Sequence, residues 1–165
     1  ANFIDSQFKQ SIHSATIDEN VQLVLFANLL YQYTGEKNYR ALAAQALSFL
    51  VLPETANRRK VFVAGILLAD QEMQAEPIHI TVVGSKADEQ ARALFAAAAA
   101  LPAPYMRVEW FDAKDGPLPN TSVELPQLPK AAAFLCGNGR CSTPAYEVEA
   151  LKRLFERARK AVGNL

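Results

Sequence analysis

The hydrophobic periodicity of this chain changes at Glu76-Pro77. Before this point, apolar residues recur at every third or fourth position, which is the spacing of amphipathic helices. After it comes "IHITVVG", which is rich in β-branched residues and ends in glycine, so residues 78–83 are predicted to form a buried strand. The sequence therefore predicts two domains, a helical segment over 1–76 and a small α/β domain over 77–165.

Three helices are predicted in the first domain. The first, over about 18–33, is indicated by "DENVQLVLFANLLYQY", and the second, over about 37–51, follows the break at "TGEKNY". The third is indicated by "RKVFVAGILLADQEM", whose apolar residues nearly surround the helix, so we expect it to be buried on several sides. Because three helices of this length would normally each keep a polar face, we expect them to belong to a larger helical array.

The second domain alternates strands and helices. After the first strand, "SKAD" reads as a capping box with Ser85 as N-cap and Asp88 three residues later, opening a helix to about 101. A strand over 105–111 is then expected to run parallel to the first, and "AAAFL" (131–135) forms a third before a closing helix, "EVEALKRLFERARKAV". The predicted fold class is mixed α/β: N-terminal helical hairpins, then a small α/β layer with a mainly parallel sheet of about three to four strands.

The connection over 112–130 has no periodicity and contains several prolines, "DAKDGPLPNTSVELPQLPK". A structureless connection of this length is unusual inside a compact domain. We therefore expect it either to be functional or to pack across another part of the protein.

Composition excludes some classes of partner. The 17 basic residues balance the 17 acidic ones, so the chain lacks the positive field that nucleic acid or an anionic membrane surface requires. It contains neither an apolar stretch approaching ~18 residues nor a signal peptide, so we expect a soluble chain without a membrane span. Because the chain starts at Ala1 rather than at methionine, we expect a processed product or a piece of a longer polypeptide. No compartment or oligomeric state is indicated.

Both cysteines, Cys136 and Cys141, lie in "FLCGNGRCSTP" on either side of a Gly-Asn-Gly turn. A glycine-rich hairpin loop would place them ~4.5–5.5 Å apart at Cα, a separation that suits a disulfide or two free thiols. Catalytic redox pairs usually have the form C-x-x-C at a helix N-terminus, which disfavours that interpretation here. Zinc would need two more ligands, and His13 and His79 lack ligand spacing. Structural thiols are the first interpretation, a disulfide the second, and an active redox or metal pair the last.

Other candidate sites have weaker signals. Gly84 and Ser85 end a strand and open a helix, where free backbone N–H groups attract anions, but the further glycines of a phosphate-binding fingerprint are missing. An ordinary β–α turn is the preferred interpretation.

Asp18 and Glu19 are adjacent and so point ~100° apart on a helix, which prevents them from flanking one bond by themselves. Asp70 and Glu72 also diverge, and helix-end charges are preferred for all four. No cofactor and no metal are predicted.

Three phrases carry a resemblance to a known family: "DENVQLVLFANLLYQYTGEKNYRALAAQAL", "IHITVVGSKADEQARALFAAA" and "AAAFLCGNGRCSTP". Together they resemble the C-terminal end of the thioredoxin-domain proteins formerly classed as a domain of unknown function, the group that includes spermatogenesis-associated protein 20. The resemblance spans roughly residues 18–160. The proteins of this family carry an N-terminal thioredoxin-like domain, then an α/α toroid similar to six-hairpin glycosidases, and then a small α/β end piece. Residues 18–74 would then be the last toroid helices and 77–162 the end piece.

The sequence shows strong packing signals and no convergent catalytic set, which predicts a structural function within such a protein. The chain would be a noncatalytic C-terminal region that completes and caps the toroid, its partners being the missing thioredoxin-like and toroid parts of the same polypeptide. Where the family usually reads Ser-Gly-Asn, this chain reads "DEN" and keeps only Asn20 as a candidate toroid contact. One alternative is a sugar-handling toroid enzyme to which Asp18 or Glu19 supplies an acid or base. Another is a thiol-linked redox module through Cys136 and Cys141.

Overall fold

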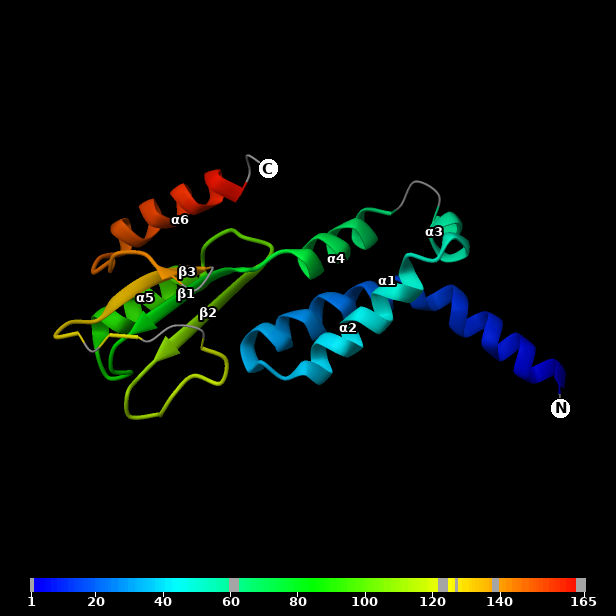
Figure 1. The fold of residues 1–165 in the computed structure, drawn as a ribbon, viewed down its shortest axis with the longest axis horizontal. Helices are drawn as coiled ribbons and strands as arrows, with labels where there is room; N and C mark the ends of the chain where they lie inside the picture. The colour runs from blue at the N-terminus through cyan, green and yellow to red at the C-terminus, as the bar shows by residue number, and fades with distance from the viewer. Residues whose placement is uncertain (1, 60–62, 122–124, 127, 138–139, 163–165) are drawn as a thin grey trace. The chain divides into compact units, whose positions relative to one another are not determined.

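A computed structural model describes residues 2–59, 63–121, 125–126, 128–137 and 140–162. The chain forms two compact units, Ala1–Glu76 and Pro77–Leu165 (Figure 1). The first is helical, and the second is a sheet with helices. Among the helices described, none combines the length and the apolar character that crossing a membrane would require.

The helical unit contains α1 (Asn2–Thr34), α2 (Lys37–Leu50), α3 (Pro53–Arg59) and α4 (Ala64–Gln74). The helices predicted over 18–33 and 37–51 are present as α1 and α2, although α1 begins already at Asn2. The third predicted helix, expected from residue 59, begins at Ala64 and is preceded by the short α3. A proline at the first position of α3 suits a separate helix start.

Side chains from α1, α2 and α4 form the core of this unit. The buried members are Ile17, Val21, Val24, Ala27, Ala43, Ala46, Leu50, Ile66 and Ala69. A polar link lies beside them: the fully buried Asn28 donates from Nδ2 to the carbonyl of Glu72 at 3.0 Å and accepts a hydrogen bond from Arg40. Arg40 also donates to the carbonyl of Met73. These bonds join α1, α2 and α4.

Large apolar side chains also remain on the outside of the helical unit. The exposed ones are Phe26, Leu42, Val51, Leu52, Leu67 and Leu68. In α4 the buried residues are Ile66, Ala69 and Glu72, whereas Leu67 is 63% exposed. Within the helical unit only one side of α4 is covered, and burial of its other sides in a larger helical array stays a prediction.

The α/β unit contains β1 (Ile78–Val83), α5 (Glu89–Ala99), β2 (Met106–Phe111), β3 (Ala132–Gly137), β4 (Arg140–Cys141) and α6 (Val148–Val162). Its four strands have the order β2-β1-β3-β4, so the mixed α/β class is confirmed. β1 and β2 are parallel, as predicted. The prediction of a mainly parallel sheet is wrong, because β3 is antiparallel to both β1 and β4.

The direction of β3 has a topological cause. A parallel strand needs a crossover that returns the chain to the end of the sheet at which its neighbour starts, and this crossover is usually a helix. α5 provides it between β1 and β2, whereas no helix lies between β2 and β3 among the described residues. The chain therefore enters β3 from the end of the sheet at which β1 finishes.

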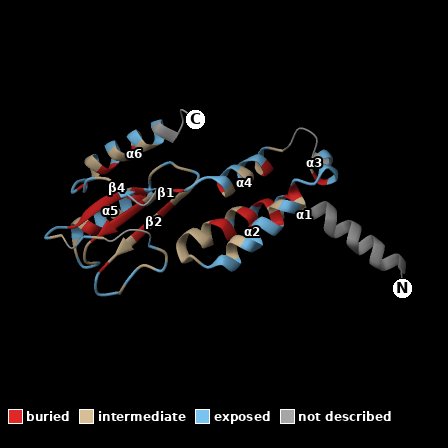
Figure 2. Ribbon diagram, in the orientation of Figure 1, coloured by how far each residue is buried: buried red, intermediate tan, exposed pale blue. Residues whose placement is uncertain are grey.

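The two faces of the sheet are covered differently. One face packs against α5 and α6 through a cluster of Ile80, Val82, Ala91, Leu94, Ala98, Ala131, Ala133, Ala145, Leu151 and Phe155. The other carries Val83, Ala132, Phe134 and Cys136, against which Leu125 and Leu128 pack. These two leucines belong to the proline-rich connection, so the connection packs across the sheet face that lacks helices. Figure 2 shows β1 and β3 largely buried, whereas β2 is mostly of intermediate burial.

Candidate functional site: a polar row beside a disulfide

A disulfide joins Cys136 of β3 to Cys141 of β4, with an S–S distance of 2.10 Å. The two residues lie directly opposite each other in the antiparallel pair, 4.0 Å apart at Cα. The N–H of Ser142 donates to the carbonyl of Leu135 at 2.7 Å, so the cysteines occupy the neighbouring position without hydrogen bonds, at which facing strands approach most closely. Of the alternatives that the sequence left open for these cysteines, the structure contains the disulfide.

The disulfide continues a line of residues that crosses the whole sheet. In the strand register, His79 of β1 lies opposite both Cys136 of β3 and Arg107 of β2. Residues paired across neighbouring strands project from the same face of a sheet. Arg107, His79, Cys136 and Cys141 thus form one line, here called the polar row, on the face that lacks helices.

Glu109 and Thr81 form the next line and bond to the polar row. The Nε2 atom of His79 lies 2.8 Å from Oε2 of Glu109 and 3.0 Å from Oγ1 of Thr81. Nη2 of Arg107 lies 2.7 Å from the same Glu109 oxygen. The side chains of His79, Arg107 and Glu109 are only 13%, 7% and 5% exposed. Glu109 therefore bridges two nitrogenous side chains in a largely buried setting.

This bridge determines the ionisation of Glu109 and the tautomer of His79. Burial by itself would raise the pKa of Glu109, but the hydrogen bonds from His79 and Arg107, together with their charges, hold that pKa below its usual value. Glu109 is then a carboxylate at neutral pH and can only accept a hydrogen bond, so Nε2 of His79 must carry the proton. The neutral imidazole consequently has its lone pair on Nδ1, for which the described residues offer no hydrogen bond. His79 has the arrangement of an oriented base.

The connection after β2 covers one end of the polar row. Arg107 donates to the backbone carbonyl of Asn120, which holds the connection over this face. At the other end, both residues of β4, Arg140 and Cys141, are exposed. The row thus reaches solvent at its disulfide end.

The candidate anion site at Gly84 and Ser85 is arranged as a closed turn. The N–H of Gly84 donates to the carbonyl of Phe111 at 3.0 Å, and the N–H of Lys86 donates to Oδ2 of Asp112 at 2.8 Å. Hydrogen bonds from the N–H groups of Lys86 and Lys114 hold the pKa of Asp112 below its usual value. A carboxylate from the end of β2 therefore occupies the position at which an external anion would bind.

The predicted N-cap of the following helix is wrong. Asp88, not Ser85, caps α5, because its side chain accepts from the N–H of Gln90 at 2.7 Å and the helix begins at Glu89. The hydroxyl of Ser85 accepts instead from the N–H of Ala87, at 3.2 Å. An extra turn thus separates β1 from α5.

The carboxylates proposed for a toroid site lie on α1. Asp18 and Glu19 are exposed and Asn20 is partly buried. The more unusual carboxyl group is that of Glu72 in α4, which is 7% exposed and whose pKa is raised by burial. No group of three or more His, Cys, Asp or Glu side chains that could hold a metal ion occurs within the described part of the chain.

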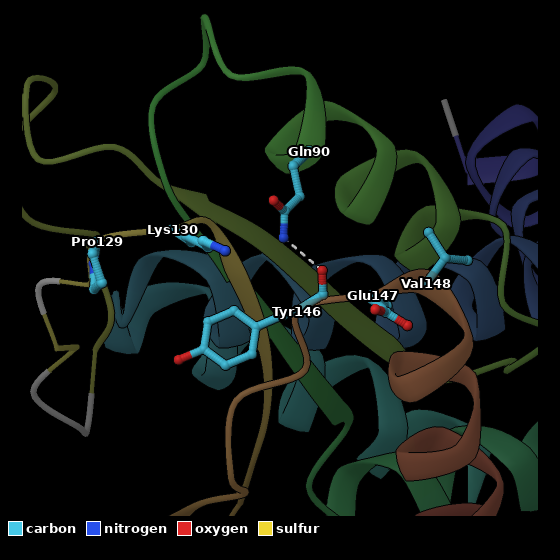
Figure 3. A pocket seen from close by; sticks show the side chains of 6 residues that line it. All are labelled: Gln90, Pro129, Lys130, Tyr146, Glu147 and Val148. Atoms are coloured by element: carbon cyan, nitrogen blue, oxygen red, sulfur yellow. Dashed lines mark hydrogen bonds between the residues drawn. The ribbon is translucent and has the colours of Figure 1, made fainter.

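A surface pocket of ≈ 680 Å³ lies at the N-terminal ends of α5 and α6 (Figure 3). It is lined by Gln90, Pro129, Lys130, Tyr146, Glu147 and Val148. The amide of Gln90 donates to the carbonyls of Tyr146, at 2.6 Å, and Ala131, at 3.1 Å. This residue therefore ties α5 to the segments before α6 and β3. The remaining polar lining is one amine, one phenol and one carboxylate, without a nucleophile beside a base.

Sequence reasoning found the cysteines but missed their polar neighbours. It considered His79 only as a zinc ligand and did not consider Arg107 or Glu109. A signal was present, because polar residues alternate with apolar ones in both "IHITVV" and "MRVEWF". The register that brings the two polar sets together depends on long-range pairing, which a single sequence does not display.

Comparison with known proteins adds no assignment: no family model, curated protein or solved structure matches this chain. The fold and the side-chain geometry are therefore the basis for assigning a function.

Proposed function

We propose that this chain is a noncatalytic structural region of a larger protein. In this proposal the helical unit is the final section of a longer helical array, the α/α toroid of the thioredoxin-domain family that the sequence resembles. The α/β unit is the end piece that completes and caps this array. The partners are the upstream thioredoxin-like and toroid parts of the same polypeptide.

The observation that carries the proposal is the apolar outer surface of the helical unit. Phe26 is 62%, Leu67 63%, Val51 52% and Leu52 49% exposed, although the unit also has a buried core. Full burial of one such side chain contributes about 1.5–3 kcal/mol. Single exposed apolar residues are common, but several on one small unit indicate a surface that another structure covers.

The arrangement of α4 supports a helical neighbour in particular. Its apolar residues Leu67 and Leu68 lie on the side away from the buried stripe of Ile66 and Ala69. A helix that is hydrophobic all round is typical of the interior of a larger helical assembly. Adjacent helices of an α/α array would supply the missing contacts of α4.

Photo-crosslinking in the natural full-length polypeptide tests this proposal. A benzophenone side chain placed at Phe26 or at Leu67 should form crosslinks within the same polypeptide, to helical segments upstream of this chain. Peptide mass spectrometry identifies the partners. The same probe at Lys37, the exposed first residue of α2, is the control and should give few crosslinks. Crosslinks exclusively to other polypeptides, or none above the Lys37 level, would contradict the proposal.

A further inference from the structure

We propose that the Cys136–Cys141 disulfide is a thiol–disulfide exchange site, opened by a dithiol reductant that attacks Cys141 and releases the sulfur of Cys136 next to His79. This inference goes beyond the structural function proposed above. It assigns a partner class, a small-molecule or protein dithiol, to the exposed end of the polar row.

The two sulfur atoms of the disulfide differ in their exposure to an attacking thiolate. Cys141 is exposed on a strand of only 2 residues at the edge of the sheet. Cys136 is 9% exposed and packs with Val83 and Phe134. Because exchange requires an attacking thiolate to reach one sulfur directly, access selects Cys141. Cys136 is consequently the leaving group.

The leaving sulfur, that of Cys136, has positively charged side chains in its surroundings. A thiol leaves faster when its pKa is low, and neighbouring cations lower that pKa. His79 lies directly opposite Cys136, at a cross-strand Cβ separation of ~4.5–5.5 Å. Among the described residues of the neighbouring strands, the other charged groups at this end of the sheet are Arg107 and Glu109 of β2 and Arg140 of β4, which together carry a net positive charge.

The imidazole of His79 can exchange a proton with the released sulfur of Cys136. Since Glu109 and Thr81 engage Nε2 of His79, its Nδ1 atom remains to exchange a proton with the sulfur of Cys136, directly or across one water. Glu109 and Thr81 therefore orient the imidazole. The same pairing of a thiolate, an imidazole and an orienting carboxylate activates cysteines in general.

The step balances as a two-electron exchange. A thiolate of the reductant attacks Sγ of Cys141, the S–S bond breaks, and its electron pair passes to Sγ of Cys136, which takes up a proton from solvent through Nδ1 of His79. The second thiolate of the reductant then attacks its own sulfur in the mixed disulfide and releases the Cys141 thiolate. Two electrons pass to the protein and the reductant becomes a disulfide. The two protons that the thiols of the reductant lose to solvent are matched by the two that the Cys136 and Cys141 thiolates take up from it.

The size of the closed loop is consistent with exchange rather than with a purely structural crosslink. The cysteines are separated by 5 positions in the sequence. In the chain-entropy account, a short loop gains least from closure. Opening this disulfide would thus remove only a small part of the stability of the unit while freeing β4.

Two measurements on the oxidised full chain test the proposal. In the first, the chain reacts with limiting glutathione, a monothiol that has no second thiol of its own to resolve the mixed disulfide, and alkylation followed by peptide mass spectrometry locates the adduct. We expect it on Cys141. An adduct on Cys136 would overturn the proposal, and so would a disulfide that dithiothreitol does not reduce in the folded chain.

The second measurement is the rate of reduction by dithiothreitol as a function of pH. His79→Gln should slow reduction about tenfold at neutral pH and raise the pKa of the Cys136 thiol, read from thiolate absorbance in the reduced chain. His13→Gln, which changes the histidine of the helical unit, is the matched control and should react like the wild type. Equal rates for all three proteins would refute the role of His79. Far-UV circular dichroism checks folding, and the adduct position in the wild-type chain decides the proposal even if His79→Gln misfolds.

Discussion

The backbone conformation at residue 84 and the atoms packed around it both require glycine at this position. Its φ of +153° lies in the region that favours glycine, and a Cβ there would come within 2.7 Å of the Cβ of Ala131. Its carbonyl also accepts a hydrogen bond from the indole of Trp110 at 2.9 Å. The sequence indicated that a glycine ends the strand. It could not indicate the contact with Ala131, which lies far away in the chain.

We predict that Gly84→Ala lowers the free energy of unfolding of the α/β unit by about 3 kcal/mol, because backbone strain and overpacking add. Gly116→Ala is the control. Gly116 also has a positive φ, +85°, but nothing lies within 4 Å of the added Cβ, so we expect a loss of only about 1 kcal/mol. Urea unfolding measures both variants. Equal losses would show that the contact with Ala131 has no effect.

Within the helical elements, Glu72 belongs to the buried stripe of α4 although it is a titratable residue. Residues 66, 69 and 72 recur at helical spacing, and all three are buried. The sequence interpretation treated Glu72 as a solvated charge at the end of a helix because it considered only the spacing of Glu72 from Asp70 and not from Ile66 and Ala69. The spacing was visible in the sequence and would have placed the carboxyl group on the inner side.

We predict that Glu72→Gln stabilises the helical unit at pH 7. Burial raises the pKa of Glu72, so the folded chain binds the proton more tightly than the unfolded chain. The stability of the wild type therefore falls as the pH rises from the ordinary glutamate pKa through the raised one, whereas glutamine does not titrate. The advantage of the variant should shrink in acid, below the ordinary glutamate pKa. Unfolding at acidic and neutral pH tests this, with the exposed Glu36→Gln as a control. A variant less stable than the wild type at pH 7 would contradict it.

The strands show which of their features can be predicted from local sequence patterns and which cannot. Residues 78–83 were predicted with the bounds that β1 has, because a β-branched run closed by glycine is a local signal. The direction of β3 was predicted wrongly, since direction depends on how the connection over 112–130 returns to the sheet. β4 was not predicted as a strand, because its 2 residues are too few to show alternation. Local patterns thus predicted where strands lie in the sequence, whereas long-range pairing determined the direction of β3 in the sheet.

At the scale of the whole molecule, each unit buries a core of its own. The helical core contains residues 17–69, and both clusters of the α/β unit contain residues from 80 onward. No strand or helix crosses from Glu76 to Pro77. The sheet therefore draws its buried partners from its own unit.

We predict that residues 77–165 fold when expressed alone, because all the strands that the structure describes, and both helices that cover them, lie within this range. The far-UV circular dichroism spectrum should show mixed helix and strand, and urea unfolding should be cooperative. The loss caused by Gly84→Ala should be the same in this piece as in the whole chain, which serves as an internal control. A piece without a cooperative transition would contradict the prediction.

The disulfide and its flanking segment also affect how the sheet meets other chains. An unpaired strand edge can template the addition of a foreign strand and so promote aggregation. Here Ala133 exchanges hydrogen bonds with Ala145, and Leu135 accepts one from Ser142, so the outer edge of β3 is satisfied by its own chain. The covalent link at Cys141 keeps this short cover in place. An oxidised molecule should therefore resist edge-to-edge polymerisation on the β3 side better than a reduced one.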